Sequence, residues 1–450
     1  MINLEQDDDE LPGGQRLKPH KSLFWNILKT VLAVAVTMLV IGAAYLSYLN
    51  WSFGLDGDVA INGEIVKNTR LTGYAGKNPY QTALYFKKHL NEDEILLYDA
   101  FEYAYENPKD TIEIKKNYTG EQFNKVLYYL KCDSPMLTVN TIGTQTQLDS
   151  TDPLQHYVVK FDLKIPIVKS YQWTKIIVPK VESENTSKNL SEQTEQAAKR
   201  IIAAMPQYKT QLEKAQYIYR WLVTNVAYDS SGRIDEGSPV CTLFGALLDK
   251  RAQCDGFAAA NMLLCNMVGI ECFKVFYTGD DVNGDTGHTW NIAKLDGNYY
   301  NIDASGGENY TKQLAKWSKG VGAGSDLVSY EKFAMTAVET KYDSPVMNKI
   351  FNGIVPECTS TTPRQSLYSM VVTQKNIGSF VKDASKKLNT GKKGKGSFIS
   401  IKFADKALCK SVSGRFDGDS GYGQAILKES TRAGSLAMHG DNDVIYLFMS

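Results

Sequence analysis

Residues 253–303 read QCDGFAAANMLLCNMVGIECFKVFYTGDDVNGDTGHTWNIAKLDGNYYNID, and this segment predicts a helix followed by strands. The helix runs from Cys254 to about Val268, and Gly269 ends it. A cysteine at a helix N-terminus lies beside unpaired backbone N–H groups and the positive end of the helix dipole, which favour the thiolate. The pattern therefore predicts a nucleophilic thiol at Cys254.

The rest of the segment predicts an antiparallel sheet. A strand spans 272–278, a loop rich in glycine and aspartate spans 279–287, and a second strand begins at residue 288. Asp296-Gly297 is typical of a two-residue hairpin turn, so residues 298–303 are expected to return as the third strand.

The register of this hairpin has a chemical consequence. If Leu295 pairs with Asn298, Trp290 lies opposite Asp303. His288 is two residues from Trp290, on the same face, and is therefore a diagonal neighbour of Asp303. The register predicts an imidazole and a carboxylate within reach of each other.

A nucleophilic thiol needs a base that takes its proton, and that base needs a partner that stabilises its charge. Cys254, His288 and Asp303 supply these roles in that order. Taken singly, each also has a structural explanation, as a buried helix-start cysteine, a strand histidine and a turn-forming aspartate. Their order and spacing together favour a catalytic triad.

These residues resemble the transglutaminase-like superfamily, a branch of the papain-type cysteine enzymes in which a helix-opening cysteine is followed by histidine and aspartate on adjacent strands. The resemblance spans about 212–306 and is carried by WLV at 221–223, YD at 228–229, ALL at 246–248, QCDGF at 253–257, GIEC at 269–272, GHTWN at 287–291 and YNIDA at 300–304. The sequence is most similar to the versions found in Gram-positive bacteria. LYDA at 97–100 and DSP at 133–135 of this chain resemble the domain that precedes the catalytic core in those proteins.

The resemblance implies an α+β fold, with the cysteine helix packed on an antiparallel sheet that bears the histidine and aspartate. It also implies acyl transfer, in which the thiolate attacks a carboxamide and water or an amine resolves the thioester. Hydrolysis, deamidation and cross-linking share the first half of that reaction. The oxyanion or acyl-pocket candidates are the N–H of Cys254, the side chain of Gln253, and Trp290, which alternatively packs in the core. No cofactor or metal is implied.

Composition narrows the alternatives. The 450 residues are 43% hydrophobic and 22% charged, which is typical of a globular chain with more than one core. The 50 basic side chains balance the 50 acidic ones, so no net charge favours nucleic acid as a partner. The seven cysteines are an odd number, so at least one has no intramolecular partner, and the disulfide pairing stays open.

The uncharged run Thr30–Leu49 has the length and composition of a transmembrane helix. Basic residues precede it, so the positive-inside rule predicts a cytoplasmic tail at 1–29 and an extracytoplasmic catalytic domain at the cell membrane. A cleaved signal peptide is the alternative, although the run is long for one. The predicted partners are the membrane, through this helix, and a protein or peptide substrate, including one associated with the cell wall.

The chain is predicted to divide into a cytoplasmic tail (1–29), a transmembrane helix (30–49), a linker or small β element (50–82), an α+β domain (83–181), the catalytic domain (190–310), a linking region (311–364) and a C-terminal α/β module (365–450). The polar stretch 182–195 is typical of a hinge or helix-entry loop. Residues 281–292 begin like a calcium loop but lack its glycine and glutamate, and Gly421-x-Gly423 predicts a turn.

Two alternatives to an enzyme stay open. One is a catalytically silent transglutaminase-like module that binds partners at the cell surface. The other is a structural stalk or assembly factor in which the flanking units matter. Reactivity of Cys254, and its dependence on His288, distinguishes the enzyme from both.

Overall fold

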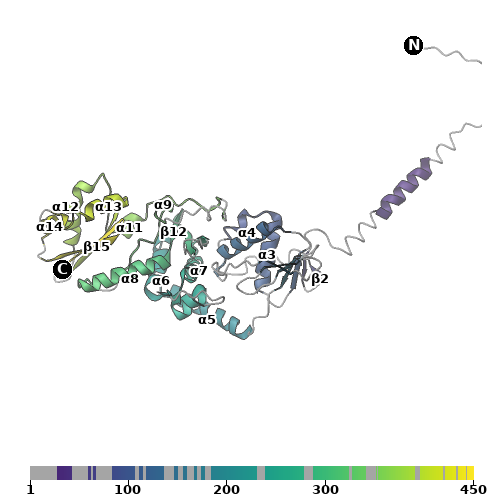
Figure 1. Ribbon diagram of the computed structural model, residues 1–450, viewed down its shortest axis with the longest axis horizontal. Helices are drawn as coiled ribbons and strands as arrows, with labels where there is room; N and C mark the ends of the chain where they lie inside the picture. The colour runs from purple at the N-terminus through teal and green to yellow at the C-terminus, as the bar shows by residue number, and fades with distance from the viewer. Residues whose placement is uncertain are drawn as a thin grey trace, which may run out of the picture. The chain divides into compact units, whose positions relative to one another are not determined.

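The computed structural model of this chain describes residues 28–42, 59–61, 64–66, 84–106, 111–114, 118–135, 146–149, 156–159, 167–169, 174–177, 184–230, 239–277, 287–323, 327–340, 351, 353–390, 396–418, 421–431, 434–441 and 443–450. It divides into two compact units, Met1–Asp58 and Val59–Ser450, of which the second contains the elements around Cys254 (Figure 1).

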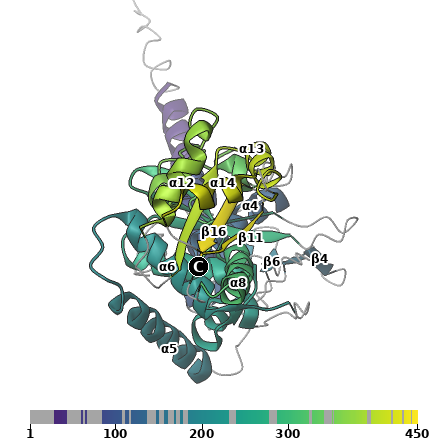
Figure 2. The ribbon, with the colours of Figure 1, turned by 90° about the vertical axis from the view of Figure 1, so that its left-hand side faces the viewer.

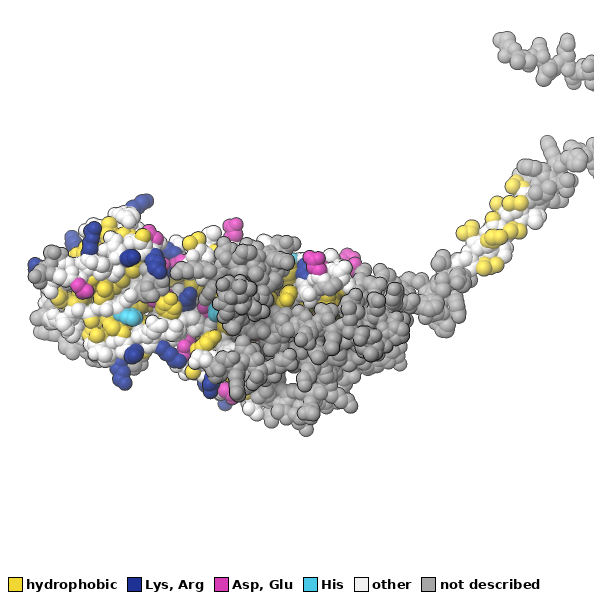
Figure 3. Space-filling view, in the orientation of Figure 1, with side chains coloured by type: hydrophobic (Ala, Val, Ile, Leu, Met, Phe, Trp, Pro, Cys, Tyr) yellow, Lys and Arg dark blue, Asp and Glu magenta, His cyan; other side chains and the backbone are white. Residues whose placement is uncertain are grey.

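In the first unit, residues 28–42 form a helix. It coincides with the beginning of the uncharged run 30–49, whose last residues lie outside the described ranges. Its large apolar side chains are exposed in the chain by itself, and Figure 3 shows them along the helix. Within the described part of the chain, no helix combines the length and the hydrophobicity needed to cross a membrane.

The second unit begins with a five-stranded sheet in the order β2-β1-β3-β7-β6. Its strands are β1 (Val59–Ile61), β2 (Glu64–Val66), β3 (Thr111–Ile114), β6 (Ile167–Lys169) and β7 (Thr174–Ile177). A 3-10 turn η1 (Lys87–His89) precedes α3 (Glu92–Glu106), and Thr119 caps α4 (Gly120–Asp133) in a capping box. Strands β4 (Thr146–Asp149) and β5 (His156–Val159) form a separate hairpin.

The sheet near Cys254 has the strands β10 (Cys272–Tyr277), β11 (His288–Leu295) and β12 (Asn298–Ile302), in that order and antiparallel. Asp296 and Gly297 both have positive φ, as a two-residue turn between twisted strands requires. The turn pairs Leu295 with Asn298, so the predicted register of the hairpin is confirmed.

Helix α7 (Cys254–Met267) packs on this sheet, with α6 (Gln211–Asn225) and α8 (Ala304–Gly320) beside it. Buried polar groups join α7 to the sheet. The amide of Asn291 donates to the carbonyl oxygen of Ala258 at 3.0 Å and accepts from Asn261 at 3.0 Å. Lys274 and Asp255, both fully buried, form an ion pair at 3.4 Å.

The stretch 182–195 is mostly helix, contrary to the predicted hinge or loop, because α5 runs from Glu184 to Ala203. The last turns of α5 bury Ala197, Ala198 and Ile201 in the core that contains α6 and α7. Tertiary packing of these apolar residues supports a helix whose first turns are polar, which local composition does not reveal.

The β10–β12 sheet lies between two cores. Phe273, Val275, Trp290 and Ile292 pack with the buried side chains of α3 and α4. Ala293, Leu295, Tyr300 and Ile302 belong instead to the core of α6, α7 and α8. Both faces of the sheet are therefore covered by helices, and α7 is held on one of them.

The region 311–364, which was predicted to be a linking region, contains ordered elements that pack on the core. Its first residues complete α8, whose Leu314 is buried. Residues 327–336 then lie along β12, where Met335 pairs with Asn301 and buries its side chain. A short helix, α9 (Ala337–Thr340), follows. Backbone pairing, which side-chain periodicity does not register, ties this region to the core.

The C-terminal residues form a four-stranded sheet in the order β13-β14-β16-β15. Its elements are α11 (Arg364–Leu367), β13 (Met370–Val372), η4 (Ile377–Ser379), α12 (Phe380–Leu388), β14 (Ser397–Phe403), α13 (Lys406–Ser413), α14 (Tyr422–Glu429), β15 (Leu436–Asp441) and β16 (Val444–Met449). Figure 2 shows α12 and α14 side by side near β16. Strands β15 and β16 pair as an antiparallel hairpin in which Asp441 lies opposite Val444.

The turn predicted at Gly421-x-Gly423 is instead the start of α14. A Cβ atom on Gly421 would lie 2.6 Å from the carbonyl oxygen of Phe416, and one on Gly423 would lie 2.9 Å from the same oxygen. The glycines allow α14 to approach this backbone, so packing explains them.

Candidate active site

Cys254 is the first residue of α7 and is 6% exposed. Two short parallel strands, β8 (Ala227–Tyr228) and β9 (Arg251–Ala252), lead into it, with the turns η2 (Pro239–Cys241) and η3 (Gly245–Asp249) between them. The N–H of Gln253 donates to the carbonyl oxygen of Val240 at 2.7 Å. A Cβ atom on Gly256 would lie 2.7 Å from that oxygen, so a glycine is needed for this close approach.

His288 and Asp303 are in direct contact, as the register predicts. Nε2 of His288 lies 3.1 Å from Oδ2 of Asp303. His288 is the first residue of β11, and Asp303 directly follows β12. Because Nε2 is used for Asp303, Nδ1 is the ring nitrogen left for a thiol.

The carboxylate of Asp303 is fixed from several directions. It caps α8, with Oδ1 accepting from the N–H of Gly306 at 2.9 Å and from the hydroxyl of Ser305 at 2.7 Å. Its own N–H donates to the carbonyl oxygen of Lys332 at 2.9 Å. A Cβ atom on Gly306 would lie 2.6 Å from Oδ2 of Asp303, the oxygen that faces His288. These contacts leave the carboxylate one position, aimed at the imidazole.

Electrostatics keep His288 charged. Burial alone would lower the pKa of His288, but the charge and hydrogen bond of Asp303, with a hydrogen bond and charge from Cys254, raise it from 6.5 to about 10. The imidazole is therefore protonated at neutral pH, and Nε2–H donates to Asp303. The interaction with Cys254 brings all three predicted side chains into one site.

Gln253 is buried, and its side chain is engaged by the protein. Its Nε2 donates to the carbonyl oxygen of Asp229 at 3.4 Å, and its Oε1 accepts from the thiol of Cys241 at 3.5 Å. A primary amide has two N–H donors, so one of them accounts for the Asp229 contact. A role as oxyanion donor would fall to the second.

Trp290 is buried in the core beneath α3 and α4. Its Nε1 donates to Oδ1 of Asn301 at 2.9 Å, and its ring is nearly parallel to that of His288, with centroids 6.0 Å apart. The indole therefore supports the imidazole from the core side.

Tyr228 borders the site, which the sequence reasoning did not anticipate. Burial, followed by the charges of Cys254 and Asp303, raises the pKa of Tyr228 to about 12. The residue is 40% exposed, and its ring stacks on Phe257, a residue of α7, with centroids 6.4 Å apart. An exposed aromatic two residues beyond the C-cap of α6 is the signal that could have identified it.

The calcium-loop resemblance at 281–292 begins in residues outside the described ranges. Among the described residues, no cluster of three or more metal-ligating side chains occurs. The expectation that no metal or cofactor takes part stays a prediction.

Comparisons with known proteins bear on the same region. Residues 196–304 match the family model of the Transglutaminase-like superfamily. Kyphoscoliosis peptidase from Homo sapiens is 24% identical over 106 residues, which cover 22% of this chain and 16% of that protein. The protein of the same name from Mus musculus is 24% identical over 104 residues, which cover 21% and 16%. This chain thus spans about a sixth of the length of these relatives.

Solved structures show a limited likeness. A crystal structure of a TGase matches at 13% identity with a TM-score of 0.23, over 30% of this chain and 41% of that chain. The periplasmic domain of TgpA from Pseudomonas aeruginosa bound to ethylmercury matches at 12% identity with a TM-score of 0.19, over 44% and 71%. At these TM-scores the overlap carries no argument of its own. The family model therefore matches the part of the chain that contains Cys254, His288 and Asp303.

Proposed function

We propose that this chain is a transglutaminase-like cysteine enzyme that transfers acyl groups from carboxamides of proteins or peptides. The observation that supports this proposal is the environment of His288. Its Nε2 lies 3.1 Å from Oδ2 of Asp303, and its pKa of about 10 also reflects a hydrogen bond with Cys254. An imidazolium between a buried carboxylate and a thiol at a helix N-terminus stabilises the thiolate form.

In the first half of the reaction, Sγ of Cys254 attacks the carbonyl carbon of the amide. Negative charge develops on the carbonyl oxygen, to which the N–H of Cys254 would donate. Nδ1–H of His288 gives its proton to the leaving nitrogen, the C–N bond breaks, and a thioester remains. In the second half, water or an amine attacks the thioester and gives a proton to His288, and Cys254 leaves as a thiolate.

Water as acceptor gives hydrolysis or deamidation, and a primary amine gives cross-linking. Asp303 orients His288 in both halves, because its Oδ1 is held by two hydrogen bonds and its Oδ2 faces the imidazolium. Tyr228 is an exposed aromatic residue whose pKa responds to the charges of Cys254 and Asp303, and we assign it to the wall that receives the substrate.

The burial of Cys254 favours one alternative, a silent module that binds a partner without chemistry. In that case the thiol would be covered and would not react. Alkylation separates the two functions, because it needs access to Sγ and a thiolate but no knowledge of the substrate.

We also propose that the run 30–49 anchors the chain in the cell membrane, with the tail 1–29 cytoplasmic and the enzyme outside. The supporting observation is the helix at 28–42, whose Val31, Leu32 and Leu39 are each at least 60% exposed. Extraction of membranes with carbonate should leave the full chain in the pellet, and its release into the supernatant would contradict the anchor.

The enzyme proposal is tested on the full chain in detergent. The alkylation rate of Cys254 by iodoacetamide is followed by peptide mass spectrometry, beside that of His288→Ala. Release of ammonia from a glutamine-containing peptide, with and without a fluorescent primary amine, then reports deamidation and cross-linking. We expect fast alkylation that falls at least about 10-fold in His288→Ala, since the imidazolium stabilises the thiolate.

Cys409 supplies an internal control, because it is a buried cysteine of α13 in the C-terminal module. Its alkylation should be slow and unchanged in His288→Ala. If Cys254 reacts no faster than Cys409, the enzyme proposal is refuted in favour of a silent module that binds a partner.

A further inference from the structure

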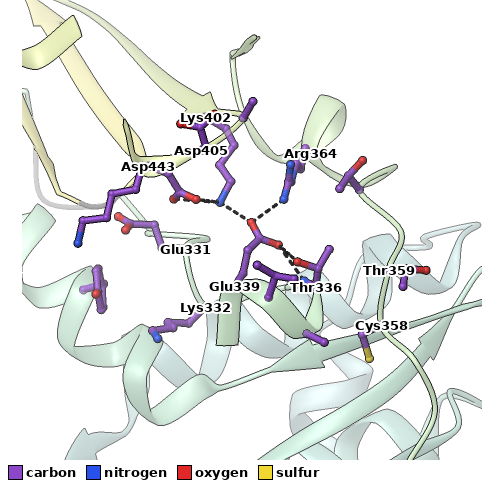
Figure 4. A pocket seen from close by; sticks show the side chains of 16 residues that line it. Glu331, Lys332, Thr336, Glu339, Cys358, Thr359, Arg364, Lys402, Asp405 and Asp443 are labelled. Atoms are coloured by element: carbon purple, nitrogen blue, oxygen red, sulfur yellow. Dashed lines mark hydrogen bonds and ion pairs between the residues drawn. The ribbon is translucent and has the colours of Figure 1, made fainter. Parts of the chain in front are cut away.

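A cavity of about 490 Å³ lies away from the Cys254 side chain, where the segment after β12 meets the C-terminal sheet. Figure 4 shows that its wall combines residues of 331–339, residues of 358–364 and residues at the end of β14. Its size is that of a site for a small molecule. Nothing in the proposed reaction uses it.

Part of the lining is an internal ion network. Oε1 of Glu339 accepts from Lys402 at 2.7 Å and from Arg364 at 2.8 Å, and Oε2 accepts from the N–H and the hydroxyl of Thr336. Lys402 also contacts Asp443 at 3.0 Å. Burial would raise the pKa of Glu339, but these partners hold it at about 2. Both oxygens of Glu339 are therefore occupied and are not open to a ligand.

Arg364 is a cation of the cavity lining that uses only part of its guanidinium donors in the ion network. Its single ion pair among the described residues is the one from Nη2 to Glu339. A guanidinium carries five N–H donors in a planar fork, which matches a carboxylate or a phosphate with two parallel hydrogen bonds. The Arg364 side chain is 18% exposed, so it is reachable from the cavity.

The balance of charge in the cavity is positive. Burial, followed by the charge of Asp443, raises the pKa of Glu331 to about 8, so this carboxyl group is neutral at pH 7. The lining then carries four cations and three anions: Lys332, Arg364, Lys402 and Lys406 against Glu339, Asp405 and Asp443. An anion is favoured over a cation in this environment.

We propose that this cavity binds a small ligand that bears a carboxylate or phosphate group, with Arg364 as its main contact. Lys332 and Lys406 add positive charge, and the largely buried network around Glu339 holds the guanidinium in place. The inference does not rest on the proposed acyl transfer. It should hold equally in a Cys254→Ala variant, so failure of one proposal leaves the other standing.

The site also has a structural connection to Asp303. Lys332, whose side chain lines the cavity, accepts the backbone hydrogen bond of Asp303 through its carbonyl oxygen. A ligand held there would stabilise the segment against which Asp303 is fixed. Binding is nevertheless measured directly, without activity as the readout.

The test is calorimetric titration of the full chain in detergent with sodium phosphate and with sodium succinate. Ethylammonium chloride at the same ionic strength is the cationic probe. We expect one or both anions to bind, and the comparison tells which oxyanion the site prefers. Arg364→Lys keeps a positive partner for Glu339 but loses the planar fork, so it should weaken binding about 10-fold or more.

Lys386→Gln, an exposed substitution on α12 outside the cavity, should bind as the unchanged protein does. Lys406→Ala provides a second variant that leaves the Glu339 network intact and should also weaken binding. The proposal is overturned if neither anion binds more tightly than chloride, if ethylammonium binds best, or if both Arg364→Lys and Lys406→Ala bind like Lys386→Gln.

Discussion

Replacing Asp303 with asparagine should discharge His288 at neutral pH. Burial favours the neutral imidazole, and the charge and hydrogen bond of Asp303 are the largest contributions that oppose it. The rise in the pKa of His288 from 6.5 to about 10 corresponds to about 5 kcal/mol in favour of the charged form. Without the carboxylate charge, the pKa of His288 should fall towards 6.5, because burial lowers it and only Cys254 still raises it.

Nuclear magnetic resonance of the imidazole ring measures this pKa, and His288→Gln identifies the signal among those of the five histidines. His288 of the unchanged protein should remain charged from pH 5 to about 8.5, whereas in Asp303→Asn it should titrate within that range. Glu271→Gln, which removes a carboxylate that accepts from Tyr299, should leave His288 unchanged. A pKa near 6.5 in the unchanged protein, or near 10 in Asp303→Asn, would refute the reasoning.

The same shift has a consequence for stability. The folded-state pKa of His288 is raised, so its stabilisation is complete below pH 6.5 and is lost as the pH rises through about 10. Chemical denaturation of the unchanged protein should therefore show a decline over this window that is reduced in Asp303→Asn.

Two further perturbations follow from close contacts. Gly306→Ala should reduce acyl-transfer activity about 100-fold or more, because the new Cβ atom would lie 2.6 Å from Oδ2 of Asp303 and displace that carboxylate. Gly320→Ala is the control on the same helix, because its Cβ atom would meet nothing within 4 Å, and it should keep full activity. Equal activities in a peptide deamidation assay would count against this account. Lys274→Met should cost about 3–5 kcal/mol in urea denaturation, since it removes the cation beside the buried carboxylate of Asp255. The double variant with Asp255→Leu should recover most of the loss. A double variant as unstable as the single one would contradict the buried ion-pair explanation.

The sequence was sufficient for the hairpin because one local feature determines its register. Asp296-Gly297 adopts positive φ at both positions, and this turn fixes every pair from Leu295 and Asn298 to Asn291 and Ile302. The elements that were missed depend on contacts distant in sequence. The segment at Met335 is held by pairing with Asn301, and no periodicity in its own side chains predicts such a bridge.

The same division applies to the site. Cys254, His288 and Asp303 were predicted because helix start and strand register are local properties. Tyr228 was not predicted, since its approach to α7 depends on the parallel pairing of β8 with β9. The Arg364 cavity was missed for a related reason, because its wall is assembled from the core and the C-terminal sheet.

Asp303 has two functions that most substitutions would remove together. As the N-cap of α8, it accepts from Gly306, and loss of such a cap costs about 0.5–2 kcal/mol of stability. As the partner of His288, it supplies a charge. Alanine would remove both the cap and the charge, so an inactive Asp303→Ala protein could have failed in its fold or in its chemistry. Asparagine keeps an oxygen that can cap the helix, whereas the charged oxygen that faces His288 is replaced by an amide NH₂ group. The asparagine variant therefore separates the electrostatic role of Asp303 from its structural one.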